Sequence, residues 1–151
     1  MKQDKYTPIV AILWISMVCI FHIVLFRTKL NMDIPIIQRL LFILVAVLVT
    51  LPLHELIHYM FMKVFRMEDA RIERAKDPLG LPSLRAIAKG EISRWKRLVI
   101  FLAPLFILTI IPDIIFCFAD HVELIFVIIA MCNAAGCCFD FLAVCNLNID
   151  R

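Results

Sequence analysis

The chain has 151 residues, of which 63% are hydrophobic, and its 16 Lys and Arg against 13 Asp and Glu give a formal net charge of +3. This composition is too apolar for a water-soluble domain of this length, and the apolar residues gather in blocks long enough to cross a bilayer. The small net charge gives no reason to expect a nucleic-acid partner. We therefore predict one all-α domain over residues 1–151, a polytopic protein of the cell membrane with about four transmembrane helices.

The first apolar segment, residues 8–26, has the length of one membrane crossing and begins with Pro8, which suits the first turn of a helix. A cleavable signal peptide is the alternative. Residues 27–33 contain no small-residue cleavage pattern, so we expect a retained anchor. His22 lies inside this segment without a motif partner, and we interpret it as a packed or interfacial side chain and not as a ligand.

The second apolar segment, residues 34–65, is longer than the roughly 20 residues that one crossing requires. We expect it to tilt, to kink or to extend beyond the bilayer. Pro52 removes a helix hydrogen bond inside this segment. It either opens the backbone beside the polar residues that follow or is a tolerated kink.

The stretch His54-Glu55-Leu-Ile-His58 follows Pro52. Residues four apart lie on the same face of a helix, so both imidazoles can reach one ion, and Glu55 can reach a water on that ion. This is the H-E-x-x-H arrangement of zinc peptidases, with the histidines as ligands and the glutamate as general base. A polar helix face without metal is the alternative, but uncompensated charge in hydrocarbon is costly. We therefore predict Zn²⁺ as cofactor.

Residues 63–97 form the only long polar stretch of the sequence, and basic residues outnumber acidic ones there. A turn-rich centre, Asp77-Pro-Leu-Gly-Leu-Pro-Ser83, divides it. The segment around residues 120–123 has no Lys or Arg. The positive-inside rule then predicts a cytoplasmic loop over residues 66–97, with both termini in the cytoplasm. Arg27 and Lys29, on the outer side in this orientation, count against it.

Two further apolar segments follow, residues 98–118 and residues 122–145. The first contains Pro104 and Pro112. The second is interrupted by residues 133–140, whose small side chains let helices approach closely. All six cysteines of the chain lie in apolar segments without the spacing of a secreted disulfide framework, so we expect them to be reduced and to serve in packing.

A catalytic zinc requires three protein ligands and an open position for water, so a third ligand must come from another helix. Apart from Glu123 at its very start, Asp140 is the only acid in the fourth apolar segment, and its expected depth matches that of His58. Cys137 and Cys138 are rival ligands, which would favour a closed structural site. Asn133 lies on about the same helix face as Asp140 and either binds a substrate carbonyl or oxyanion or makes an interhelical hydrogen bond.

Three features together resemble a known class: Pro52-Leu-His54-Glu55-Leu-Ile-His58, the turn Leu102-Ala-Pro104, and the small-residue stretch 133–140. The chain resembles the site-2-protease class of intramembrane zinc metallopeptidases, and more closely the small zincin membrane peptidases of bacteria. The resemblance covers residues 40–145.

The resemblance implies that His54 and His58 are ligands, that Glu55 is the base and that Asp140 is the third ligand. It also implies a membrane protein or peptide as substrate. The sequence departs from the larger members of the class, which have Asp-Gly after a Pro-rich stretch, because Asp140 is followed by Phe141.

The sequence therefore predicts an intramembrane zinc metallopeptidase that hydrolyses peptide bonds of membrane-associated substrates. A non-catalytic zinc-binding membrane regulator or chaperone-like partner is the first alternative, and an occupied fourth zinc position would distinguish it. A small transporter with an intramembrane His, Glu and Asp relay is the second. The lipid bilayer is the expected surrounding partner, and the sequence leaves the oligomeric state open.

Overall fold

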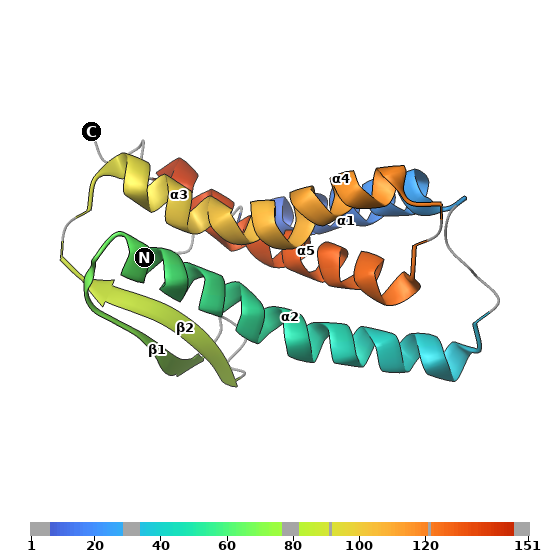
Figure 1. Cartoon of the computed structure of the whole chain (residues 1–151), viewed down its shortest axis with the longest axis horizontal. Helices are drawn as coiled ribbons and strands as arrows, with labels where there is room; N and C mark the ends of the chain where they lie inside the picture. The colour runs from blue at the N-terminus through green and yellow to red at the C-terminus, as the bar shows by residue number, and fades with distance from the viewer. Residues whose placement is uncertain (1–6, 29–33, 77–81, 91, 121, 147–151) are drawn as a thin grey trace.

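The computed structural model describes residues 7–28, 34–76, 82–90, 92–120 and 122–146. The described elements, in chain order, are α1 (Thr7–Phe26), α2 (Ile36–Val64), β1 (Glu68–Lys76), β2 (Pro82–Lys89), α3 (Arg94–Leu105), η1 (Phe106–Ile110), α4 (Ile111–Phe118) and α5 (Leu124–Asn146). The helix α3, the π-helical turn η1 and the helix α4 follow one another without a break and act as one long helix (Figure 1).

Four helical spans in the described chain are long and apolar enough to cross a membrane: Ile9–Phe26, Ile36–Val64, Arg94–Phe118 and Leu124–Phe141. Large apolar side chains cover their outer faces, as expected for surfaces that meet lipid. The predicted helical, multi-span class is confirmed, because four long apolar helices make up most of the described chain and the strands are few. The predicted orientation stays a prediction, and Lys2, Lys5 and Arg151 lie outside the described residues.

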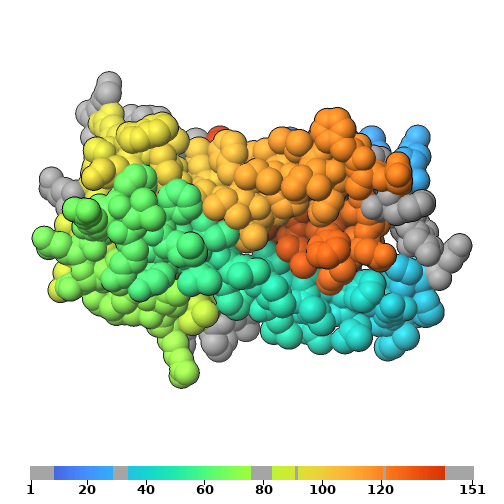
Figure 2. Space-filling view, viewed as in Figure 1, coloured from blue at the N-terminus to red at the C-terminus, as the bar shows by residue number. Residues whose placement is uncertain are grey.

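The helix α5 is the centre of the bundle, since it contacts α1, α2 and α3. Its red-orange atoms fill the seam between α2 and the α3–α4 helix in Figure 2. The residues it buries are mostly small, including Ala130, Ala134 and Cys138, so neighbouring backbones can approach closely. Trp14 of α1 donates its indole N–H to the Ala134 carbonyl (2.7 Å) and stacks on Phe141.

The helix α2 ends in a Schellman motif that turns the chain out of the bundle. Arg66 adopts a left-handed conformation (φ 55°) directly after the capping residue Phe65. The Arg66 N–H donates to the Lys63 carbonyl (2.9 Å), and the Met67 N–H donates to the Met62 carbonyl (3.0 Å). The basic side chain at this position is unusual because glycine avoids the steric cost of that φ. The motif directs the backbone from the helix into β1.

Residues 66–97, predicted to be a loop, contain an antiparallel hairpin of β1 and β2. The hairpin packs against the end of α2 (Figure 1). Its register places Ile72 opposite Ala86 and Arg74 opposite Leu84, and a bulge lies between Glu68 and Arg71. The tip of the hairpin, residues 77–81, lies outside the described residues.

A buried ionisable pair joins α1 to α4. His22 Nε2 lies 3.1 Å from Asp113 Oδ2, and the exposed fractions of the two residues are 2% and 9%. His22 Nδ1 donates to the Val18 carbonyl (2.9 Å). His22 is therefore a packed residue with a carboxylate partner, as an ionisable group in a membrane helix requires.

Candidate metal centre

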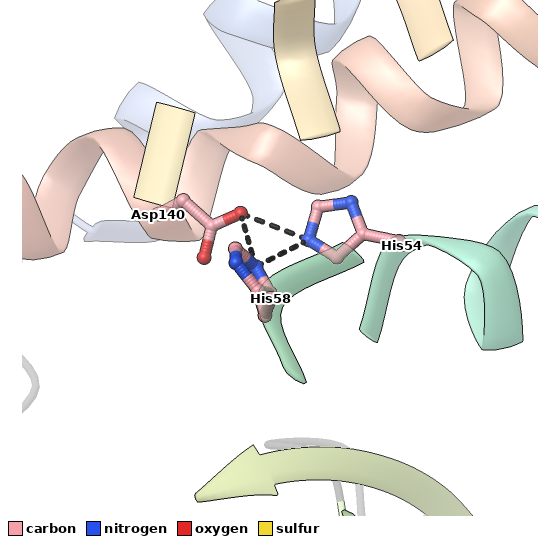
Figure 3. A group of neighbouring side chains, drawn as sticks. All are labelled: His54, His58 and Asp140. Carbon is pink, nitrogen blue, oxygen red and sulfur yellow. Dashed lines mark hydrogen bonds and ion pairs between the residues drawn. The ribbon is translucent and has the colours of Figure 1, made fainter. Parts of the chain in front are cut away.

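Two histidines of α2 and one aspartate of α5 converge on a point inside the bundle (Figure 3). His54 Nε2 lies 3.1 Å from His58 Nε2. Asp140 Oδ2 lies 2.9 Å from the first of these nitrogens and 3.4 Å from the second. The histidines are buried and the aspartate is half-buried. The i, i+4 spacing on one helix face brings the two imidazoles together, as predicted, and α5 supplies the carboxylate from across the seam.

The tautomer of His58 follows from its contact with the backbone of α3. His58 Nδ1 lies 2.8 Å from the Ile100 carbonyl oxygen. A carbonyl oxygen can only accept, so Nδ1 must carry the proton. The Nε2 atom of the neutral ring is then an unprotonated lone pair that points toward Asp140.

The tautomer of His54 follows from Asn133 in the same way. The Asn133 amide nitrogen donates to the Pro104 carbonyl (2.9 Å) and to the Thr109 hydroxyl (2.9 Å). This fixes the orientation of the amide, so the oxygen Oδ1 faces His54 Nδ1 at 3.0 Å and must accept its proton. In the neutral ring, the His54 Nε2 atom is therefore also an unprotonated lone pair.

Three acceptor atoms thus face one another in a buried space. The buried Asp140 Oδ2 atom has no hydrogen-bond donor among the described residues. Such a set repels itself unless a cation or a proton lies between its members. One proton satisfies a single pair, whereas a metal ion contacts all three atoms.

The three atoms are spaced closely enough to share one zinc ion, with two of the edges shorter than those of an ideal site. Zinc bonds of about 2.0–2.1 Å in a tetrahedron place neighbouring ligand atoms roughly 3.3–3.4 Å apart. The three observed edges are 2.9, 3.1 and 3.4 Å. Two neutral imidazoles and a carboxylate form one face of a tetrahedron and leave the fourth position for water, which is the donor set of a catalytic site.

The two rival cysteines do not join this group. His54, His58 and Asp140 offer ligand atoms that all lie within 4.8 Å of one another, and neither Cys137 nor Cys138 belongs to such a group among the described residues. Both cysteines are buried in α5. The assignment of the third ligand to Asp140 stays a prediction that this geometry supports.

Glu55 joins α2 to the hairpin, next to the first histidine of the metal-binding group. It follows His54 on α2 and is half-buried. Its Oε2 atom accepts a hydrogen bond from the Ala86 N–H of β2 (2.7 Å). A backbone group of the hairpin therefore holds one oxygen of the predicted general base.

A family model described as "Putative zincin peptidase" matches residues 47–149. The match covers more than half of the chain and includes every residue of the metal-binding group. The chain belongs to this zincin peptidase family. The family implies a metallopeptidase that uses zinc, and the three ligand atoms described above can hold such an ion. Neither a curated protein nor a solved structure matches the chain.

The contacts that hold the zincin site together were only partly visible in the sequence. The predicted residues of α2 and α5 do meet, but the partners of their outer atoms are backbone groups of Ile100, Pro104 and Ala86. A contact made by a backbone group cannot be predicted from the type of residue that makes it. Pro104 is the exception, because a proline inside a helix leaves the carbonyl four residues earlier, that of Ile100, without its usual donor.

Proposed function

We propose that the protein is an intramembrane zinc metallopeptidase that hydrolyses peptide bonds of membrane-associated substrates. The observation that carries the proposal is the convergence of His54, His58 and Asp140, with both ring tautomers fixed, inside spans that can cross a membrane. The family relationship supports metallopeptidase chemistry, and the burial of the site among membrane helices supports its location.

Each residue of the site would have a separate role in the reaction. Bound zinc would lower the pKa of its water toward neutrality and polarise the scissile carbonyl. His54, His58 and Asp140 would hold the ion. Glu55 would accept the proton of the water and return it to the leaving amine. The Ala86 N–H would hold Glu55 Oε2 and leave Oε1 to face the water.

The hairpin offers a backbone surface for an extended substrate. The Ala86 N–H points away from β1 toward α2, so the outer edge of β2 faces the site. The period of two along a strand places the backbone groups of Leu84 and Ala88 on the same edge. We propose that an unwound substrate segment pairs with this edge, because added strands gain main-chain hydrogen bonds there.

The Glu55→Gln variant tests the catalytic assignment. It retains the three metal ligands and loses the proton acceptor, so we expect zinc content like that of the parent and at least a hundredfold slower cleavage of a co-expressed membrane substrate. Zinc measured by mass spectrometry and cleavage measured by immunoblot report the two properties separately. Parent-like cleavage by the variant would remove Glu55 from the mechanism.

The second candidate is a non-catalytic zinc-binding membrane regulator. One contact favours it, since Glu55 Oε2 is already held by Ala86 and a substrate on the β2 edge must pass close to that bond. This candidate predicts that the parent binds zinc but cleaves none of the membrane proteins that it copurifies with. Glu55-dependent cleavage of one such protein would contradict it.

A further inference from the structure

We propose that Pro104 is the positioning residue of the metal centre, and that it holds both imidazoles through two different carbonyl groups. His58 is held through the carbonyl of Ile100, and His54 is held through the carbonyl of Pro104 itself and the side chain of Asn133. This inference rests on the proposed metal site and does not depend on peptidase activity.

The first contact arises from the N–H that proline lacks. In an α-helix the residue at position 104 would donate to the carbonyl four residues earlier, which is that of Ile100. Pro104 lies inside α3 and has no N–H to donate. The Ile100 carbonyl is therefore left for the His58 Nδ1–H, which approaches to 2.8 Å. Ile100 and Pro104 are both buried, so water does not compete for the Ile100 carbonyl.

The second contact uses the carbonyl of Pro104 itself, just before a π-helical turn. The turn η1 begins two residues after Pro104, and its wider hydrogen-bond pattern shifts the donors of the next residues. The Pro104 carbonyl accepts the amide N–H of Asn133 (2.9 Å). Asn133 is 1% exposed, and its oxygen then faces His54 Nδ1 (3.0 Å).

The two contacts have one chemical result. Each imidazole carries its proton on Nδ1, so each presents Nε2 to the ion as a lone pair in a fixed ring orientation. Partners that fix the tautomer of a ligating histidine typically change metal affinity by about 10- to 100-fold when they are removed. The helical turn at Pro104 thus orients both His54 and His58 of α2 for metal binding, from the neighbouring helix α3.

The Pro104→Ala variant restores the N–H that competes for the Ile100 carbonyl. We expect its zinc dissociation constant, measured by chelator competition in detergent, to rise roughly tenfold. The Pro112→Ala variant is the matched control, because it makes the same change about two turns further along the same helix, and we expect parent-like affinity. Parent-like affinity in Pro104→Ala, in a protein that loses zinc when His58 is replaced by Ala, would overturn the proposal.

A backbone substitution separates the N–H from the shape of the ring. The α-hydroxy acid counterpart of alanine at position 104 lacks the N–H as proline does. It should return zinc affinity to within about threefold of the parent, since it leaves the Ile100 carbonyl to His58. If it binds zinc as weakly as Pro104→Ala, the missing N–H is not the cause.

Nuclear magnetic resonance of the zinc-loaded protein distinguishes positioning from general damage. We expect the Nδ1–H signal of His58 to shift or to exchange with water in Pro104→Ala. In Asn133→Ala we expect the Nδ1–H signal of His54 to shift or to exchange with water, and the Nδ1–H signal of His58 to remain unchanged. Equal disturbance of both signals by Asn133→Ala would contradict separate contacts. If the parent and His58→Ala bind zinc equally, the proposed site itself fails, which is a different result.

Discussion

At the scale of single residues, the protons decide the chemistry of the centre. Each of the two imidazoles of α2 gives its proton to an outer acceptor, and this leaves two nitrogen lone pairs and a carboxylate oxygen in contact. A buried group of acceptors has no stable arrangement without a cation or a proton. The metal proposal therefore follows from hydrogen-bond direction as well as from residue type.

Thr109 supports this network from one step further away. Its buried hydroxyl donates to the Ala130 carbonyl (3.1 Å) and accepts from Asn133. The Thr109→Val variant keeps the shape and removes both hydrogen bonds, so we expect a loss of about 1–2 kcal/mol in the free energy of unfolding. Zinc affinity should change less than about threefold, because Asn133 keeps its bond to Pro104.

Denaturation in detergent and chelator competition measure these two quantities for Thr109→Val. A loss of zinc affinity as large as that in Asn133→Ala would show that the hydroxyl, and not the Pro104 carbonyl, orients the amide.

At the scale of elements, helix breakers and helix ends position the site. Pro104 and the turn η1 redirect two carbonyl groups toward α2 and α5. The Schellman motif at Arg66 turns the chain so that the hairpin reaches Glu55. The long spans themselves have little conformational choice, since a membrane helix must satisfy its backbone internally.

The pair of His22 and Asp113 is the corresponding link between α1 and α4. The His22→Leu variant leaves a buried carboxyl group without its partner, and we expect it to lower the free energy of unfolding by about 3–5 kcal/mol. Replacing Asp113 by Leu in the same chain removes the stranded group and should recover most of that loss.

Thermal unfolding compares the stability of the single and double variants of this pair. Zinc content serves as the control that each variant is folded. A double variant that is less stable than His22→Leu would show that Asp113 is not a costly stranded group once His22 is removed.

At the scale of the whole molecule, sequence periodicity and length were enough for the bundle but not for the hairpin. The four apolar segments and the meeting of His54, His58 and Asp140 could be predicted, because hydrocarbon demands long helices and makes ionisable groups inside them rare. The strands were missed because their residues are mostly charged or small. The turn-rich residues 77–81 between these two strands, of nine and eight residues, could have indicated a hairpin.

The contact of β2 with Glu55 had no signal in the sequence at all, since it uses a backbone N–H. The orientation of the bundle follows only from the basic residues around the hairpin and stays a prediction. Labelling of a cysteine introduced at Lys89 with an impermeant reagent would decide it, because a label gained from outside intact cells would place the hairpin on the outer side.

X-ray absorption at the zinc edge of the purified protein tests the central claim most directly. The account predicts one zinc per chain with two imidazole nitrogens and light oxygen neighbours at about 2.0–2.1 Å, and loss of the metal in Asp140→Ala. A sulfur neighbour at about 2.3 Å, or parent-like zinc content in Asp140→Ala, would contradict the site built from His54, His58 and Asp140.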